Sequence, residues 1–227
     1  MIVHSRVVGL DLSLKGPGVC AASGDARAKV GEGLEIEVAK FRAGEDVRGP
    51  QRLATVSRAI ESWLASRGLL TPGRLFAQEG YSFASQQAHS LGEIGGCVRM
   101  ILWEYGCNLI VVPPSTLKKY LTGKGVGDKN IVMKHVFKRW AFDSDDDDEC
   151  DAFGCSVLGL VAVSDDAGWT NAEREILTKK VERYAGQGQE GWLGGAAPGK
   201  VAGRAGRRAS RRARGRSAVL GEDLPRT

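Results

Sequence analysis

The run Val7-Val8-Gly9-Leu10-Asp11-Leu12-Ser13 constrains the fold more than any other part of the sequence. A short apolar run followed closely by Lys15-Gly16-Pro17-Gly18 is typical of a buried strand that ends in a turn. Its one charged residue is Asp11. A carboxylate inside a buried strand is costly unless a cation or hydrogen-bond donors meet it, and a metal ion is the simplest solution. The alternative is an aspartate that caps the following turn, and this stretch alone favours neither interpretation.

The chain of 227 residues, 42% of them hydrophobic, is long enough for one domain with a sizeable core plus a tail. It has no apolar stretch of the roughly 20 residues that a membrane span needs, and no signal peptide pattern. We therefore expect a cytoplasmic protein without membrane association. If the source is viral, the expected location is the cytoplasm of the host cell. The five cysteines form no Cys-x-x-Cys pair, which argues against a disulfide framework and a zinc site.

Two more apolar segments, 19–23 and 34–41, predict that the domain opens with three antiparallel strands. The amphipathic pattern over 50–67 predicts a helix that covers this sheet. The segment 74–79 predicts a fourth strand, and its last residue is a second acid, Glu79. Two strands thus carry one carboxylate each.

A long helix is predicted over 85–105, with an apolar face and with Gly92, Gly95 and Gly96. These glycines permit close approach of another backbone, either in the protein's own sheet or in a second copy. The remaining predicted elements are a fifth strand over 108–112 and helices over 116–121, 129–140 and 171–184.

An acidic run over 143–149, interrupted only by Ser144, precedes the apolar segment 152–163. Capping and the helix dipole explain any one acid at a helix N-terminus, but they do not explain so many. The run lacks the glycine and the glutamate that an EF-hand needs at its sixth and twelfth positions. On a helix that begins near Asp148, the side chains of Asp148 and Asp151 share a face.

Four carboxylates converge if the first strand is central, the fourth strand is its neighbour and the late helix packs across both. Crowded carboxylates raise one another's pKa values unless divalent cations neutralise them. Oxygen ligands without His or Cys favour Mg²⁺ or Mn²⁺. Two such ions stabilise the attacking and leaving oxygens when water hydrolyses a phosphodiester. The four acids are Asp11, Glu79, Asp148 and Asp151.

An ordered set of motifs over about residues 5–165 resembles the RuvC-type Holliday junction resolvases of the ribonuclease H-like superfamily. The resemblance implies an α/β fold whose five-stranded mixed sheet has the order 3-2-1-4-5, with the first three strands antiparallel and helices on its faces. It also implies a homodimer that makes paired nicks in a four-way DNA junction. The motifs are Gly9-Leu10-Asp11 with Gly18, Gln78-Glu79, Leu117-Lys118 through Thr122-Gly123 to Asp128-Lys129, and Asp148-x-x-Asp151-Ala152.

The same resemblance implies roles for individual residues. The four acids would be catalytic and would hold two Mg²⁺ or Mn²⁺ ions, although a slip of one residue from Asp148 to Asp147 stays open. Lys118 and Lys129 match family lysines near the scissile phosphate and the junction backbone, and Lys124 lies between them. The alternative for each lysine is a solvated surface charge. The helix over 85–105 matches the dimerisation helix of the family.

An aromatic residue of the family contacts bases at the junction centre, but here Ser82 falls at that position. Its neighbours Tyr81 and Phe83 are the candidates for the stacking role. Either of them is equally well explained as core packing.

The last part of the chain, 186–227, is rich in Gly, Ala and Arg and lacks periodicity, which predicts a disordered basic tail after a nuclease domain over 1–185. Nine Lys or Arg and two Asp or Glu lie beyond residue 190, which leaves 23 basic against 25 acidic residues before it. Such a tail suits contact with phosphate backbones, because the predicted domain itself is slightly acidic.

Together these features predict a structure-selective endonuclease that resolves four-way junctions with two metal ions. One alternative is a nuclease of the same superfamily that acts on flaps, forks or RNA–DNA hybrids, and another is a non-catalytic DNA-binding module. The actin-like ATPases share the strand order, but 15–18 is a poor phosphate loop, and 123–129 lacks the P-loop order. No nucleotide cofactor is therefore expected.

Overall fold

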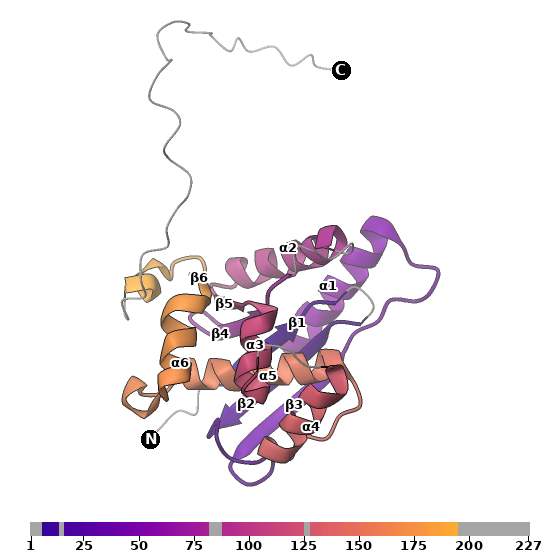
Figure 1. Ribbon diagram of the computed structural model, residues 1–227. Helices are drawn as coiled ribbons and strands as arrows, with labels where there is room; N and C mark the ends of the chain where they lie inside the picture. Colours follow the sequence, from indigo (N-terminus) through magenta and orange to yellow (C-terminus); the bar gives the residue numbers. More distant parts are fainter. Residues whose placement is uncertain (1–5, 14–15, 82–87, 125–127, 195–227) are drawn as a thin grey trace, which may run out of the picture.

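The computed structural model describes residues 6–13, 16–81, 88–124 and 128–194, and Figure 1 shows their arrangement. A mixed sheet with the strand order β3-β2-β1-β4-β5-β6 forms the middle layer. The first three strands pair antiparallel, while β4 pairs parallel with β1 and β5 pairs parallel with β4. The predicted sheet is therefore confirmed. Its strands are β1 (Val7–Asp11), β2 (Gly18–Gly24), β3 (Leu34–Lys40), β4 (Leu75–Glu79) and β5 (Asn108–Val112).

A sixth strand, β6 (Glu182–Tyr184), pairs antiparallel with β5, so the sheet is larger than predicted. The polar helix predicted over 171–184 is wrong from residue 181 onward, where β6 forms. Within 171–184, only α6 (Asn171–Glu175) and a π-helical turn (Ile176–Lys180) are helical. The outer edge of β5 offers unpaired backbone groups, and pairing with β6 satisfies them.

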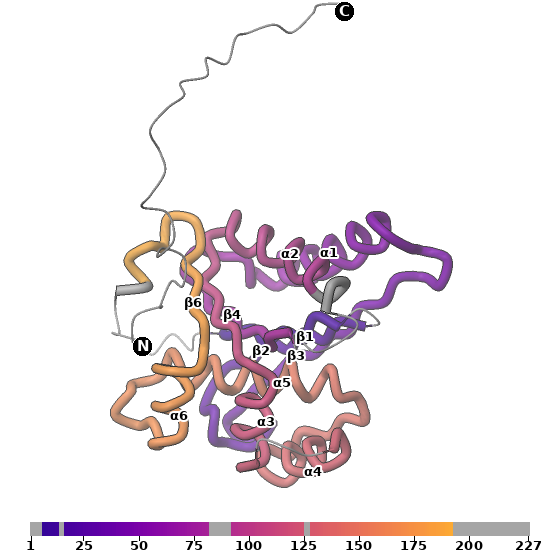
Figure 2. Tube along the Cα trace, turned by 45° about the horizontal axis from the view of Figure 1, so that its top comes forward, coloured from indigo at the N-terminus to yellow at the C-terminus, as the bar shows by residue number. Residues whose placement is uncertain are grey.

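Helices cover both faces of the sheet, as Figures 1 and 2 show. On one face, α1 (Gly49–Ser66) and α2 (Ala88–Glu104) enclose a core with Val8, Leu10 and Phe76. On the other face lies α5 (Asp147–Val163), which packs on β1 and β2. Successive side chains of a strand point to opposite faces, so Val7 and Ala77 belong to the core under α5.

The helix α5 is apolar nearly all round because other helices cover its outer side. These are α3 (Pro114–Thr122) and α4 (Lys129–Trp140), and both contact α5. Trp140 and Phe153 meet edge to face with ring centroids 5.7 Å apart, which joins α4 to α5. This contact holds α4 against the second turn of α5.

The segment 186–194, which the sequence assigned to the tail, lies against the domain. The backbone N–H of Gly186 donates to Asn108 Oδ1 at 3.1 Å, and that of Gln187 donates to the Trp103 carbonyl at 3.0 Å. A short 3-10 helix (Glu190–Gly194) follows. The rest of the predicted tail lies outside the described residues. All five cysteines are free thiols, and no helix in the described part is long and apolar enough to cross a membrane.

Candidate metal centre

Three acids meet at the edge of the sheet where β1 and β4 end. Asp11, Glu79 and Asp151 each offer one carboxylate oxygen, and these oxygens lie within 4.8 Å of one another. The two strands are parallel with Gly9 opposite Ala77, so their last residues reach the same edge. Strand alternation turns both acids toward α5, whose second turn supplies Asp151. The structure thus brings three of the four predicted acids into one cluster.

Asp148, the fourth predicted acid, borders this cluster. Its charge raises the pKa of Asp11, while its Oδ2 accepts from Ser13 Oγ at 3.0 Å and lies 3.2 Å from Lys40 Nζ. Asp147 instead forms an ion pair with Lys129. The structure therefore places Asp148 rather than Asp147 beside Asp11.

The cluster is electrostatically strained because its acids are partly buried and close together. Burial and the neighbouring carboxylates raise the pKa of Asp11 well above its ordinary value. Burial, together with the charge of Asp151, raises the pKa of Glu79 to about 8. Burial raises the pKa of Asp151 to about 6, while the positive charge of Lys118 acts in the opposite direction. A bound cation would stabilise the charged carboxylates in the same way.

The donor set fits a hard divalent cation. Every ligand that the cluster offers is a carboxylate oxygen, and neither His nor Cys belongs to it. Such oxygens suit Mg²⁺ and Mn²⁺ better than zinc. The residues present therefore match the type of ion that the resemblance implies.

Another acid of the run, Asp146, caps the helix. Its Oδ1 accepts from the backbone N–H groups of Asp148 at 3.0 Å and Glu149 at 3.3 Å. Ser144 Oγ donates to Glu149 at 2.8 Å. The acidic run therefore combines helix capping with the supply of carboxylates to the cluster, and its excess of acids has two causes.

The predicted DNA-binding lysines lie in different settings. The charge of Lys118 lowers the pKa of both Glu79 and Asp151. Lys129 is paired with Asp147 at the start of α4. Lys124 is exposed just beyond α3, and its backbone N–H donates to Thr122 Oγ1 at 3.1 Å.

The aromatic residue Tyr81 packs against α2. Its hydroxyl accepts from Gln78 Nε2 at 3.1 Å, and the Arg99 guanidinium lies 5.2 Å from the ring centroid. A Cβ on Gly95 would lie 1.2 Å from the same hydroxyl, so this glycine makes room for the tyrosine. These contacts are those of a packed side chain. Phe83, the other aromatic candidate, lies outside the described residues.

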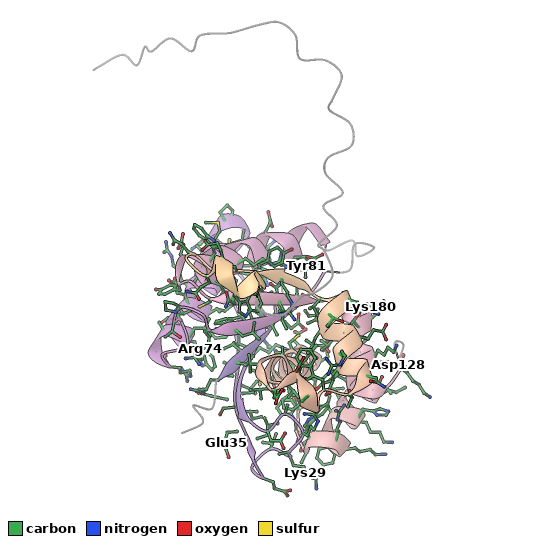
Figure 3. All side chains as sticks on the ribbon, turned by 90° about the vertical axis from the view of Figure 1, so that its left-hand side faces the viewer. Lys29, Glu35, Arg74, Tyr81, Asp128 and Lys180 are labelled. Atoms are coloured by element: carbon green, nitrogen blue, oxygen red, sulfur yellow. The ribbon has the colours of Figure 1, made fainter. Side chains whose placement is uncertain are left out.

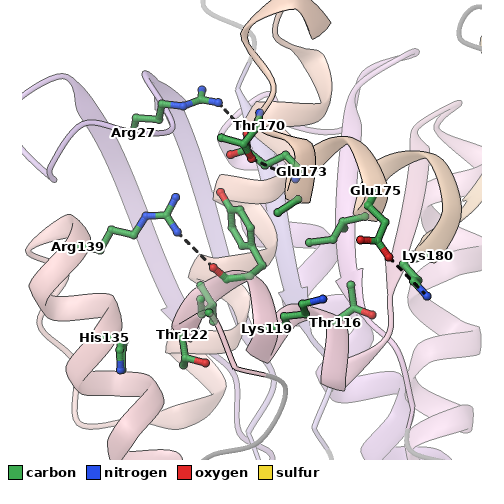
Figure 4. A pocket seen from close by; sticks show the side chains of 15 residues that line it. Arg27, Thr116, Lys119, Thr122, His135, Arg139, Thr170, Glu173, Glu175 and Lys180 are labelled. Carbon is green, nitrogen blue, oxygen red and sulfur yellow. Dashed lines mark hydrogen bonds and ion pairs between the residues drawn. The ribbon is translucent and has the colours of Figure 1, made fainter.

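A separate cavity of about 480 Å³ lies between α3, α4 and the region of α6 (Figure 4). Lys119 lines it, whereas its neighbour Lys118 does not. Arg27 donates to Glu173 at 2.8 Å in the same cavity, and Arg139 donates to the Tyr120 carbonyl at 3.2 Å. None of the four predicted acids lines it.

Sequence reasoning missed Lys40 and Ser13, both of which contact Asp148. The register of the sheet would have revealed Lys40, since Asp11 pairs with Gly18 and Gly18 pairs with Lys40. That register depends on the long connection between β2 and β3, and local patterns do not determine it.

No family model and no curated protein matches the sequence. Two solved structures of Thermus thermophilus RuvC match the fold. One aligns with 17% identity and a TM-score of 0.56 over 69% of this chain and 95% of RuvC. The other, in complex with a Holliday junction substrate, aligns with 15% identity and a TM-score of 0.55 over 68% and 92%.

A Fowlpox virus resolvase in complex with substrate Holliday junction DNA aligns with 14% identity over 70% of this chain and 99% of the resolvase. Its TM-score of 0.41 is too low to support a structural argument. The two RuvC alignments suffice to define the fold. The chain has the RuvC-like form of the ribonuclease H-like fold.

Proposed function

We propose that this protein is a metal-dependent endonuclease that resolves four-way DNA junctions. One observation carries the proposal: three carboxylate oxygens lie within 4.8 Å of one another where two strands of a RuvC-like sheet end beside α5. The solved RuvC complex contains a Holliday junction substrate, which makes such a junction the first substrate to test.

The acids Asp11, Glu79, Asp148 and Asp151 would hold Mg²⁺ or Mn²⁺, with two ions per site. Bound ions of this kind activate water and stabilise the charge that develops on a phosphodiester. Lys118, whose charge reaches Glu79 and Asp151, would bind the scissile phosphate. Lys124 and Lys129, both exposed, would contact the junction backbone.

We also propose that the active form is a homodimer joined through α2. Met100 and Trp103 are exposed large apolar residues on this helix, at 64% and 51% of their surface. Gly92 and Gly96 lie on the same side of α2 as these two residues, because the positions are three or four residues apart. A Cβ on either glycine would meet no atom within 4 Å. Small residues beside exposed apolar ones suit close packing of a second helix. Two protomers would then supply one metal centre for each of two nicks.

The dimer is tested by changing the two apolar residues. We expect Met100→Glu combined with Trp103→Glu to give a monomer in light scattering, because each carboxylate would be desolvated at the interface. The matched control is Phe137→Glu, since Phe137 is 52% exposed but lies on α4. An unchanged mass of the double variant, or a monomeric wild type, would contradict the proposed interface.

The nuclease is tested by cleavage of a synthetic immobile four-way junction, compared with a flap and a linear duplex, in Mg²⁺, in Mn²⁺ and in chelator. We expect paired nicks on opposite strands of the junction, and none in chelator. Asp11→Asn and Glu79→Gln should abolish cleavage and leave junction binding largely intact. If the protein prefers the flap, the proposed substrate class becomes branched DNA in general and not four-way junctions in particular. Cleavage by both variants would exclude this metal centre.

A further inference from the structure

One row of the sheet connects the candidate metal centre to a lysine. Asp11 on β1 pairs with Gly18 on β2, and Gly18 pairs with Lys40 on β3. Paired residues project their side chains on the same face, so Asp11 and Lys40 flank the glycine on the side of α5. A Cβ on Gly18 would lie 2.5 Å from the Asp148 carbonyl oxygen. The missing side chain thus lets the first turn of α5 lie between Asp11 and Lys40.

Lys40 is held in this place by two carboxylates. Its side chain is only 17% exposed, and its Nζ forms ion pairs with Asp146 and with Asp148, the latter at 3.2 Å. Asp146 contacts Lys40 through Oδ2 while its Oδ1 caps α5. The ammonium is therefore bound to the frame of the helix as well as to a predicted metal ligand.

The Oδ2 atom of Asp148 already has two partners. Ser13 Oγ donates to it at 3.0 Å, and Lys40 Nζ lies 3.2 Å away. The oxygens of Asp11, Glu79 and Asp151 form a compact cluster without Asp148. The three-acid cluster suits a first ion, whereas a second ion at Asp148 would meet an ammonium that repels it and competes for the same oxygen.

We propose that Lys40 competes with the second divalent cation for Asp148. The inference rests on the proposed metal centre. In the DNA-free protein the first ion binds at Asp11, Glu79 and Asp151, while Lys40 keeps Asp148. Binding of the second ion requires the ammonium to leave Asp148, and a backbone phosphate of DNA is an anionic partner that could take it. Lys40 is then a positioning residue that links assembly of the two-ion centre to DNA.

The test measures Mn²⁺ binding to the DNA-free protein, by calorimetry for the affinities and by electron paramagnetic resonance for coupling between two nearby ions. We expect one tight ion in the wild type. In Lys40→Gln the second ion should bind about tenfold tighter or more, the effect of losing one charge-assisted hydrogen bond, and spin coupling should appear. Lys40→Arg, which keeps the charge, should behave like the wild type.

The matched control is Lys29→Gln, which removes the same charge from an exposed lysine before the start of β3. Figure 3 shows Lys29 at the opposite end of the molecule from Tyr81, which follows Glu79 by two residues. If Lys40→Gln, Lys29→Gln and the wild type bind the second ion with equal affinity, the inference about Lys40 is wrong. The proposed metal centre is not affected by that result.

A second variant keeps the test valid if Lys40→Gln does not fold. Asp148→Asn should retain the first Mn²⁺ and lose the second, because the first ion needs only the three-acid cluster. Loss of the first ion in Asp148→Asn would overturn the division of roles. If neither the wild type nor any variant binds Mn²⁺, the proposed metal centre is excluded. Both this inference and the proposed function would then be wrong.

Discussion

Gly9 of β1 lies directly against Ala152 of α5: a Cβ on Gly9 would come within 1.9 Å of the Ala152 carbonyl oxygen and 2.4 Å of the Ser156 nitrogen. Gly9 precedes Asp11 by two residues on the same face of the strand, and Ala152 follows Asp151. This contact therefore sets the height of α5 above β1, and with it the separation of two carboxylates in the candidate centre.

Gly9→Ala should destabilise the protein and weaken metal binding. The atoms in the way belong to the backbone of α5, so the helix has to move, and overpacking of this kind costs about 1–3 kcal/mol. Denaturant unfolding measures the free energy, and Mn²⁺ titration measures the affinity. Gly168→Ala is the control, because a Cβ there meets no atom within 4 Å. Equal stability of the two variants would contradict this packing argument.

The metal-free protein should lose stability as the pH rises from about 4.5 to about 8. Burial raises the pKa of Glu79 from its ordinary 4.5 to about 8 and that of Asp151 from 3.8 to about 6. The folded state therefore binds protons that the unfolded state has already released, and deprotonation favours unfolding. Thermal unfolding in chelator across this pH range measures the effect.

Glu79→Gln should flatten that pH dependence, because the amide does not titrate. Mg²⁺ should also oppose it, since an ion that binds the folded protein stabilises it most where the carboxylates are charged. A melting temperature of the wild type in chelator that rises through this pH range would contradict the raised pKa values.

In the metal-free protein, Lys118→Ala should move the deprotonation of Glu79 and Asp151 to higher pH, by about one unit. The charge of Lys118 lowers the pKa of Glu79 and Asp151, so its removal makes both acids harder to deprotonate. The pH midpoint of deprotonation, followed by carbon-13 NMR of the two carboxyl groups in chelator, measures the shift. Lys119→Ala, the neighbouring change on α3, alters a residue of the separate cavity and should leave the midpoint in place. Equal midpoints for the two variants would show that Lys118 does not act on the acids.

Local patterns in the sequence predict most elements of the fold and the acids that they carry. The strand order that brings the acids together comes from the resemblance to the RuvC-type family. Asp11 and Glu79 end apolar runs that become neighbouring strands, and Asp148 and Asp151 have the spacing of one helical face. Both signals arise within short segments, so they need no knowledge of distant contacts. The pattern does not tell which acid caps the helix, because Asp146 is chemically identical to its neighbours in the run.

Features that depend on distant contacts are not predictable in this way. Strand β6 has three residues and forms because the edge of β5 is available. Lys40 reaches Asp148 through a register that spans three strands. The segment after Gly186 has no periodicity, yet its backbone bonds to Asn108 and Trp103 fix it to the domain.

Two truncations should separate the stability of the domain from the role of the basic tail. Trp192 is partly buried against the core, and the Arg183 guanidinium lies 5.4 Å from its ring centroid. Ending the chain after residue 185 removes this packing and should lower the free energy of unfolding by about 2 kcal/mol, whereas ending it after residue 194 should not.

Both truncations remove the arginines beyond residue 200, so both should weaken junction binding and flatten its dependence on salt. The slope of the logarithm of the binding constant against the logarithm of the salt concentration should fall by about 0.9 for each phosphate that the arginines neutralise in the full chain. Fluorescence anisotropy at several salt concentrations measures that slope. A slope equal to that of the full chain would show that the arginines do not bind DNA, and equal stability of the two truncations would show that 186–194 adds nothing to the fold.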